Sequence, residues 1–245
     1  MMFILVLKMN ERFLRYELLV GKESLDKLSS SHVLLLGVGG VGGYAAEALA
    51  RSGIGEITIV DGDSLSITNI NRQIIALTST IGLSKVDVME KRIKDINPNC
   101  IVNKISSFIK SDSVDLLFTN HYDFVIDAID TITIKILVIK KCLEKNIPFI
   151  SCMGMANKKD PFQFKIMDIK KTEMDPVARV IRLALRKDNI KGNVPVLISL
   201  EKPIKQEIVF EEGTTRKEKM PPGSNAFIPP MAGLILASYA VNKLI

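Results

Sequence analysis

The sequence predicts an α/β fold: a Rossmann-like, doubly wound and mostly parallel sheet, with helices before it and an elaborated C-terminal region after it. Two observations predict this class. Apolar runs of strand length alternate with amphipathic helical stretches from residue 32 to residue 152. The first strand, at 33–36, leads into a glycine turn and then a helix, the local arrangement that holds phosphate in nucleotide-binding proteins.

The expected elements follow in regular order. Before the sheet, leucines at helical spacing indicate a helix that ends at Gly21 and a second short helix. The expected strands are 33–36, 56–60, 101–105, 124–126 and 148–152, and then 163–167, 194–199 and 207–210. The expected helices are 44–49, 85–96, 112–118, 132–145, 177–187 and an apolar final helix within 226–245. We expect one domain over residues 1–245, with a nucleotide-binding core at about 30–155 and a basic region at about 156–245.

Four glycines give the turn after the first strand its expected chemistry. Gly37 allows the tight turn, Gly39 and Gly40 let the backbone approach a phosphate, and Gly42 lets the helix pack on the strand. The N-terminus of that helix offers unpaired N–H groups and a partial positive charge. The alternative is a tight turn without a ligand, and the glycines alone do not tell which nucleotide binds.

The second strand ends in two carboxylates, Asp61 and Asp63. A carboxylate at this position is where a nucleotide-binding crossover places the acceptor for its ribose hydroxyls. An NAD-binding fold would explain these features equally well.

The next segment separates ATP from NAD, because it is polar and carries fixed cations. An NAD site holds its pyrophosphate mostly through backbone N–H groups, whereas a site that expels pyrophosphate needs Arg and Lys side chains. Ser84 is expected to cap the helix at 85–96, which places Lys85 in the first helical turn. The polar residues of this segment are Asn69, Asn71, Arg72, Gln73 and Lys85.

Two further carboxylates, Asp127 and Asp130, follow the strand at 124–126, and Thr131 comes next. The carboxyl ends of strands in open α/β sheets bind ligands, so one of these carboxylates would hold Mg²⁺ against phosphates. The alternative for Asp130 is that it caps the helix at 132–145.

The net charge of +6 lies entirely in the C-terminal part. Residues 1–150 hold 17 basic and 17 acidic residues, and residues 151–245 hold 16 and 10. On the helix at 177–187, Arg179, Arg182 and Arg186 are expected to form a basic stripe opposite Val180 and Leu185. Such a stripe suits a phosphate backbone, and a solvated helix face is the alternative.

Other features exclude several classes of protein. The three widely spaced cysteines indicate a reducing compartment without a disulfide framework or a cysteine-ligated zinc. Few aromatic residues and no tryptophan exclude a broad stacking surface for single-stranded RNA. Pro229 and Pro230 leave about 15 residues of final helix, fewer than the roughly 20 that a membrane span needs.

Taken together, GVGGVG, DGD, NINRQ, Lys85 and DAID resemble the ThiF/MoeB family, the adenylating domain shared with ubiquitin-activating enzymes. Within this family the chain resembles the tRNA threonylcarbamoyladenosine dehydratases over essentially its whole length. The stretches that carry this likeness are RFLRYELLVGKE, TNINRQI, SCMGMANKKDP, DIKKTEMDPVARVIRLALRK and KMPPGSNAFIPPMAGLILASY.

The resemblance implies ATP and Mg²⁺ as ligands and a homodimer as the assembly. In MoeB-like dimers an arginine of the partner's N-terminal segment reaches the triphosphate, and Arg15 matches that position. The remaining implied roles are Gly39 and Gly40 at the α-phosphate, Asp61 at the ribose, Asn69, Arg72 and Lys85 at the phosphates, and Asp130 at Mg²⁺.

The implied activity is the ATP-dependent dehydration of threonylcarbamoyladenosine in tRNA. ATP would adenylate the threonine carboxylate, the ureido group would close a ring, and AMP and pyrophosphate would leave. The basic C-terminal part would bind tRNA in the cytoplasm, with sulfur-transfer proteins as further partners in the family. The alternatives are an adenylyltransferase for a ubiquitin-like sulfur carrier, an NAD-dependent oxidoreductase, and a tRNA-binding scaffold with a relict pocket. The first usually carries two Cys-x-x-Cys pairs, which this sequence lacks.

Overall fold

The computed structural model describes residues 2–205 and 222–245, and of residues 2–10 the backbone only. Its centre is a seven-stranded sheet in the order β3-β2-β1-β4-β5-β7-β6. All neighbouring strands are parallel except β6 and β7, which are antiparallel. The strands are β1 (His32–Leu36), β2 (Glu56–Val60), β3 (Ile101–Ile105), β4 (Phe124–Asp127), β5 (Phe149–Cys152), β6 (Phe164–Asp168) and β7 (Pro195–Ser199). The predicted Rossmann-like, mostly parallel sheet is confirmed.

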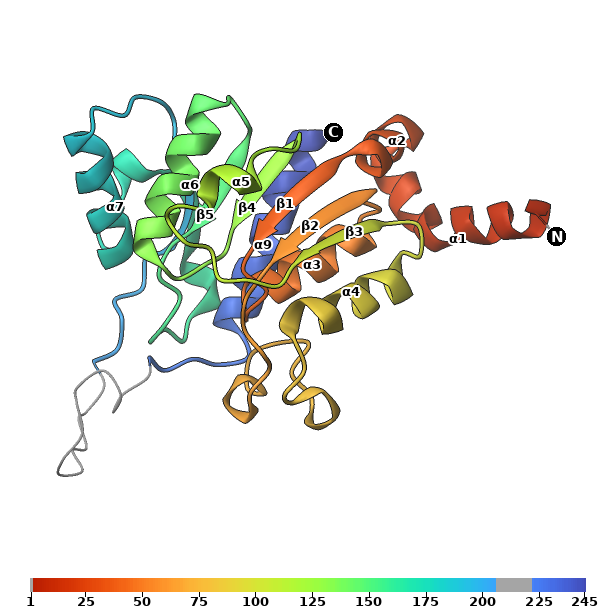
Figure 1. The fold of residues 1–245 in the computed structure, drawn as a ribbon, viewed down its shortest axis with the longest axis horizontal. Coiled ribbons are helices and arrows are strands. Elements are labelled where there is room, and N and C mark those ends of the chain that lie inside the picture. The colour runs from red at the N-terminus through yellow and green to blue at the C-terminus, as the bar shows by residue number, and fades with distance from the viewer. Residues whose placement is uncertain (1, 206–221) are drawn as a thin grey trace.

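Helices cover both faces of this sheet, as Figure 1 shows. Because side chains alternate along a strand, Val33 and Leu35 of β1 enter one apolar core, and Leu34 and Leu36 enter the other. The first core includes residues of α3, α4 and α9, and the second includes residues of α5, α6 and α7. The bounds of these helices are α3 Gly42–Arg51, α4 Lys85–Ile96, α5 Val114–Leu117, α6 Ile132–Glu144, α7 Pro176–Lys187 and α9 Ile228–Leu244.

Two helices precede the sheet, α1 (Met2–Val20) and α2 (Lys22–Ser30). Gly21 separates them with a φ of 83°, a left-handed conformation that glycine adopts without steric cost. In Figure 1, α1 extends away from the body of the molecule. Leu18 and Leu19 on it are each 79% exposed.

Some expectations need correction or cannot be checked. Ser84 does precede α4, but its side chain makes no capping hydrogen bond. Helix α6 begins after Thr131, so Asp130 is not its N-cap residue. The strand expected at 207–210 lies outside the described residues. Within the described part of the chain, no helix has the length and apolar character that crossing a membrane requires.

The order of the strands creates a crevice between β1 and β4. From β1 the chain proceeds to β2 and β3 on one side, whereas β4 and β5 lie on the other. The connections after β1 and β4 therefore diverge at the carboxyl ends of these two adjacent strands. Open α/β sheets bind their ligands at such a switch point.

Candidate functional site

A cavity of about 400 Å³ opens at this crevice, within the usual range for small-molecule sites. Most of the residues that sequence reasoning selected lie in its wall. They are Gly37, Gly39, Gly40, Asp61, Asp63, Asn69, Arg72, Gln73, Lys85, Asp130 and Thr131. Four other residues expected at the ATP site do not line it: Arg15, Gly42, Asn71 and Asp127.

The glycine turn has the close approaches that its sequence suggested. Gly37 has a φ of 87°, and a Cβ there would lie 2.8 Å from the carbonyl oxygen of Ala128, in the connection after β4. A Cβ on Gly42 would lie 1.8 Å from the Gly37 carbonyl oxygen, so Gly42 serves the packing of α3 on the turn. No side chain caps the N-terminus of α3. Apart from the Gly43 N–H, which donates to the Gly39 carbonyl oxygen at 2.9 Å, its first N–H groups suit an anionic ligand.

Asp61 connects the end of β2 to the glycine turn. Its Oδ2 accepts a hydrogen bond from the Val38 N–H at 2.8 Å, and its Oδ1 accepts one from the Asp63 N–H at 2.9 Å. These bonds fix the carboxylate beside the cavity. Its contact with a ribose remains a prediction.

Lys85 is a buried cation at the cavity wall. It begins α4 and is only 5% exposed. Its Nζ donates to Asp63 Oδ2 at 2.6 Å and lies 3.7 Å from Asp61 Oδ1. The two carboxylates offset the cost of burying the ammonium group and fix it in the cavity wall.

Arg72 is the second cation of the wall, and it is restrained by its own loop. Its Nη1 donates to the carbonyl oxygen of Thr68 at 2.8 Å and to Asn71 Oδ1 at 2.9 Å. Asn71 therefore acts on Arg72 from outside the cavity. Asn69 Oδ1 accepts from the Ser66 N–H at 3.0 Å and shapes the same turn.

Gln73 has a polar atom that the protein leaves unsatisfied. The side chain is 7% exposed, and Oε1 has no hydrogen-bond partner among the described residues. An unpaired buried amide oxygen is costly. Because this side chain lines the cavity, a bound donor would relieve that cost.

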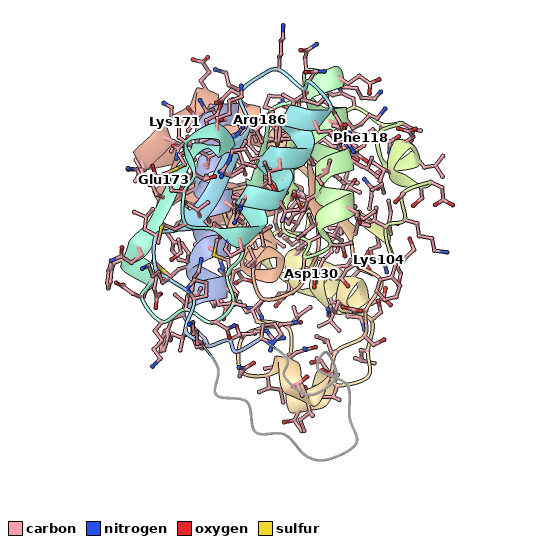
Figure 2. The ribbon with its side chains drawn as sticks, turned by 90° about the vertical axis from the view of Figure 1, so that its left-hand side faces the viewer. Lys104, Phe118, Asp130, Lys171, Glu173 and Arg186 are labelled. Atoms are coloured by element: carbon pink, nitrogen blue, oxygen red, sulfur yellow. The ribbon has the colours of Figure 1, made fainter. Side chains whose placement is uncertain are left out.

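Asp130 presents an exposed carboxylate to the cavity from the connection after β4 (Figure 2). Its Oδ1 accepts a hydrogen bond from Thr131 Oγ1 at 3.4 Å, a weak contact. Among the described residues, no three His, Cys, Asp or Glu side chains form a metal cluster. A single carboxylate beside the glycine turn nevertheless fits Mg²⁺, which takes most of its other ligands from phosphates and water.

Asp127, expected as an ATP or Mg²⁺ ligand, does not line the cavity. It is fully buried, and Lys135 Nζ donates to its two oxygens at 3.0 and 3.1 Å. Ser151 Oγ donates to Oδ2 at 2.5 Å, and the Ile129 N–H donates to Oδ1 at 3.2 Å. Asp127 therefore holds the backbone of the connection that presents Asp130.

Sequence reasoning missed three groups of residues in the wall. Two of the groups directly follow strands, and the alternating pattern of strands and helices could have indicated their place at the ligand-binding edge of the sheet. The third group comes from the distant C-terminal part of the chain. They are Ser107, Phe108 and Ile109 after β3, Met155 and Ala156 after β5, and Pro222, Ser224 and Pro229 before and within α9.

The basic stripe on α7 is only partly available. Arg182 Nη1 donates to the carbonyl oxygen of Thr172 at 2.6 Å, so this side chain stabilises the preceding turn. Val180 is 48% exposed, and the buried face consists of Ala178, Ile181 and Leu185. The expected stripe of three arginines opposite Val180 is therefore wrong. Arg179 and Arg186 are exposed, and Figure 2 shows Arg186 at the end of α7 away from Asp130.

All three cysteines are buried thiols. Burial raises the pKa of Cys152 to about 12 and that of Cys100 to about 11, and it also raises the pKa of Cys142. A thiol of such high pKa provides little thiolate for nucleophilic attack at neutral pH.

Comparison with known proteins gives consistent matches. A model described as ThiF family matches residues 12–241. The tRNA threonylcarbamoyladenosine dehydratase of Bacillus subtilis (strain 168) is 51% identical over 97% of this chain and 96% of that protein. The protein of the same name from Haemophilus influenzae is 38% identical over 91% of this chain and 89% of its own.

A solved structure gives the same likeness. The tRNA N6-threonylcarbamoyladenosine dehydratase of E. coli, TcdA, in complex with ATP matches with a TM-score of 0.86 at 35% identity. The match covers 96% of this chain and 94% of that one. These findings confirm the resemblance that the motifs indicated.

Proposed function

We propose that this chain, which belongs to the ThiF family, uses ATP to dehydrate threonylcarbamoyladenosine in tRNA to its cyclic form. The observation that carries the proposal is the cavity at the β1–β4 switch point. It combines a glycine turn, an uncapped helix N-terminus and two fixed cations, Arg72 and Lys85. The dehydratases that this chain resembles along nearly all of its length supply the substrate.

Different residues of the cavity bind different parts of the ATP molecule. Asp61 and the residues after β3 receive the nucleoside, and Gly39 and Gly40 bring backbone N–H groups to the α-phosphate. Arg72 and Lys85 stabilise the charge that develops as pyrophosphate leaves. Because both cations are held by neighbouring groups before ATP arrives, little reorganisation is needed during the reaction.

Asp130 is the residue that would hold Mg²⁺. The ion would screen the negative charge of the phosphates when bound. Asp130 suits this role because its carboxylate faces the cavity and makes only a weak contact with Thr131.

Ring closure needs no nucleophile from the protein. Once the threonine carboxylate carries AMP, the ureido group of the same side chain attacks the activated carbonyl and AMP departs. The proximity of the two groups is a property of the substrate. The buried, high-pKa cysteines agree with this route and disfavour a thioester or persulfide.

The assembly and the setting follow from the same proposal. The exposed Arg179 and Arg186 would contact tRNA phosphates, and Arg15 would reach the triphosphate of the partner in a homodimer. The protein would act in the cytoplasm, and sulfur-transfer proteins would be its further partners. The exposed Leu18 and Leu19 on α1 support an association through that helix.

The second candidate is an adenylyltransferase for a ubiquitin-like sulfur carrier. It would share the ATP site but act on a C-terminal Gly-Gly. The missing Cys-x-x-Cys pairs disfavour it.

ATP–pyrophosphate exchange and AMP release test the proposal. The purified chain is incubated with tRNA that bears the threonylcarbamoyl group, with the same tRNA lacking it, and with a small Gly-Gly-ending carrier protein. The proposal expects AMP only with the modified tRNA. Exchange that requires the carrier protein and ignores tRNA would contradict it.

A further inference from the structure

Asn157 is unusual in using its backbone and its side chain to join separate segments of the chain. Its carbonyl oxygen accepts the Ile204 N–H at 2.7 Å, and its N–H donates to the Gly223 carbonyl oxygen at 2.8 Å. Its Oδ1 accepts the Gly223 N–H at 2.6 Å. One residue thus holds positions 204 and 223 together, although 18 positions separate them in the sequence.

The backbone of Asn157 explains why this residue type occurs there. Its φ is 59°, in the left-handed region that most side chains avoid and that asparagine tolerates. The turn aims the N–H and the side-chain oxygen at the same partner, Gly223. Glycine would also accept this backbone, but it would supply no Oδ1.

Buried contacts of the next residue, Lys158, fix the loop that carries Asn157. Lys158 is 4% exposed, and its Nζ donates to the Gly154 carbonyl oxygen at 2.7 Å. The same Nζ lies 3.6 Å from Asp175 Oδ2, and Asp175 caps α7 through the Ala178 N–H. Burial lowers the pKa of Lys158. The loop is therefore anchored on α7.

The segment that Asn157 holds forms part of the cavity wall. Pro222 and Ser224 flank Gly223 and line the cavity. Asn225 strengthens this connection, because its Nδ2 donates to the Lys158 carbonyl oxygen at 2.9 Å while its Oδ1 accepts the Ile228 N–H at 2.8 Å. The turn at 222–225 is thus fixed to the loop and to the start of α9.

This wall borders Arg72 and the glycine turn, the part of the cavity to which the proposed function assigns the phosphates. Asn71 Nδ2 donates to the Ser224 carbonyl oxygen at 3.1 Å, and Asn71 also holds Arg72. A Cβ on Gly40 would lie 3.0 Å from Pro229 Cβ. The turn at 222–225 therefore borders the part of the cavity where an acceptor carboxylate would meet the α-phosphate.

We propose that Asn157 is a positioning residue for the acceptor substrate: its Oδ1 fixes the turn at 222–225, which guides the carboxylate toward the α-phosphate. This inference rests on the proposed adenylation of a tRNA-borne carboxylate. It assigns Asn157 to the acceptor step and not to the binding of ATP.

Three variants of the full chain separate this role from a general structural one. Asn157→Gly keeps the left-handed backbone and the two backbone hydrogen bonds but removes Oδ1. Asn157→Asp keeps an acceptor oxygen. Asn189→Gly is the matched control, because Asn189 has a φ of 54°, follows α7 and does not line the cavity.

Kinetics with modified tRNA at saturating ATP give the main readout. Asn157→Gly should lower kcat/KM for the tRNA about tenfold, the effect of losing one hydrogen bond. The Kd for ATP should change less than twofold. Asn157→Asp should stay within about threefold of the unchanged protein, and Asn189→Gly should match it.

Amide exchange gives a readout independent of activity. The Gly223 N–H should exchange about tenfold faster in Asn157→Gly and at the original rate in Asn189→Gly. The proposal would be overturned if Asn157→Gly changed neither the exchange of the Gly223 N–H nor kcat/KM, or only one of the two. It would also be overturned if Asn157→Gly weakened ATP binding as much as it lowered kcat/KM, or if Asn157→Asp lost as much kcat/KM as Asn157→Gly. Inactivity of the unchanged protein on modified tRNA would instead refute the proposed function, and the exchange experiment would still test the hydrogen bond.

Discussion

Replacing Lys135 by methionine should destabilise the fold strongly, because it leaves the Asp127 carboxylate charged and buried without its ammonium partner. The side chains of Lys135 and Asp127 are 2% and 1% exposed. Removing one member of such a pair costs about 3–5 kcal/mol of unfolding free energy. At about 2–4 °C per kcal/mol for a chain of this size, Tm should fall by roughly 6–20 °C.

Urea unfolding followed by far-UV circular dichroism measures this loss, since the chain has no tryptophan to report by fluorescence. The double variant Asp127→Asn with Lys135→Met removes both charges, and its amide oxygen can accept from the Ile129 N–H while its amide nitrogen donates to Ser151 Oγ. Its stability should return to within about 2 kcal/mol of the original.

An exposed ion pair supplies the control. Lys140 Nζ lies 2.5 Å from Asp188 Oδ2, but these side chains are 31% and 41% exposed. Lys140→Met should therefore cost less than about 1 kcal/mol. The reasoning would be refuted if Lys135→Met cost no more than this control, or if the double variant were as unstable as the sum of its single changes.

Three further predictions concern catalysis, tRNA binding and pH. Lys85→Met should lower kcat for pyrophosphate release about 100-fold or more, because it removes a cation that meets developing charge; a smaller loss would place Lys85 outside the reaction. Arg186→Ala should weaken tRNA binding and reduce its salt slope by about 1, whereas Arg182→Ala should lower Tm and leave the slope unchanged. Burial lowers the pKa of His32, so the unfolded chain binds its proton at higher pH than the folded protein does. Unfolding free energy should therefore fall from pH 7 to pH 5.5, and His32→Gln should flatten that slope in urea titrations; an unchanged slope would contradict this.

The central strands of the sheet were predictable because they are buried on both faces. Continuous runs of branched apolar residues, such as 33–36 and 56–60, are typical of strands buried in a parallel sheet. The predicted bounds of β2 match the observed ones. The glycine turn was equally clear, since a Cβ on Gly42 would clash with the Gly37 carbonyl oxygen. Both features were predictable because they depend on residues close to one another in the sequence.

The predictions failed for side chains that could bind either of two partners. A carboxylate at a strand end can face the crevice or the core, and Asp127 faces the core because Lys135, eight residues later in the first turn of α6, reaches it. Arg182 likewise binds a carbonyl oxygen of the preceding turn and not solvent. Helical spacing alone assigns such residues to a face but does not reveal the partner.

The contribution of Asn157 was beyond sequence reasoning for another reason. Its partners Ile204 and Gly223 are distant in the chain, and nothing in their types announces the pairing. The sequence shows only the residue type; asparagine tolerates the left-handed conformation, and many asparagines adopt it in ordinary turns.

The mass of the modified nucleoside tests the central claim most directly. The protein is incubated with ATP and tRNA bearing the linear threonylcarbamoyl group, the tRNA is digested under mild conditions, and the nucleosides are weighed. We predict a nucleoside lighter by one water, formed with one AMP per product and absent with the Lys85→Met variant. An unchanged nucleoside mass despite ATP turnover would contradict the dehydratase function.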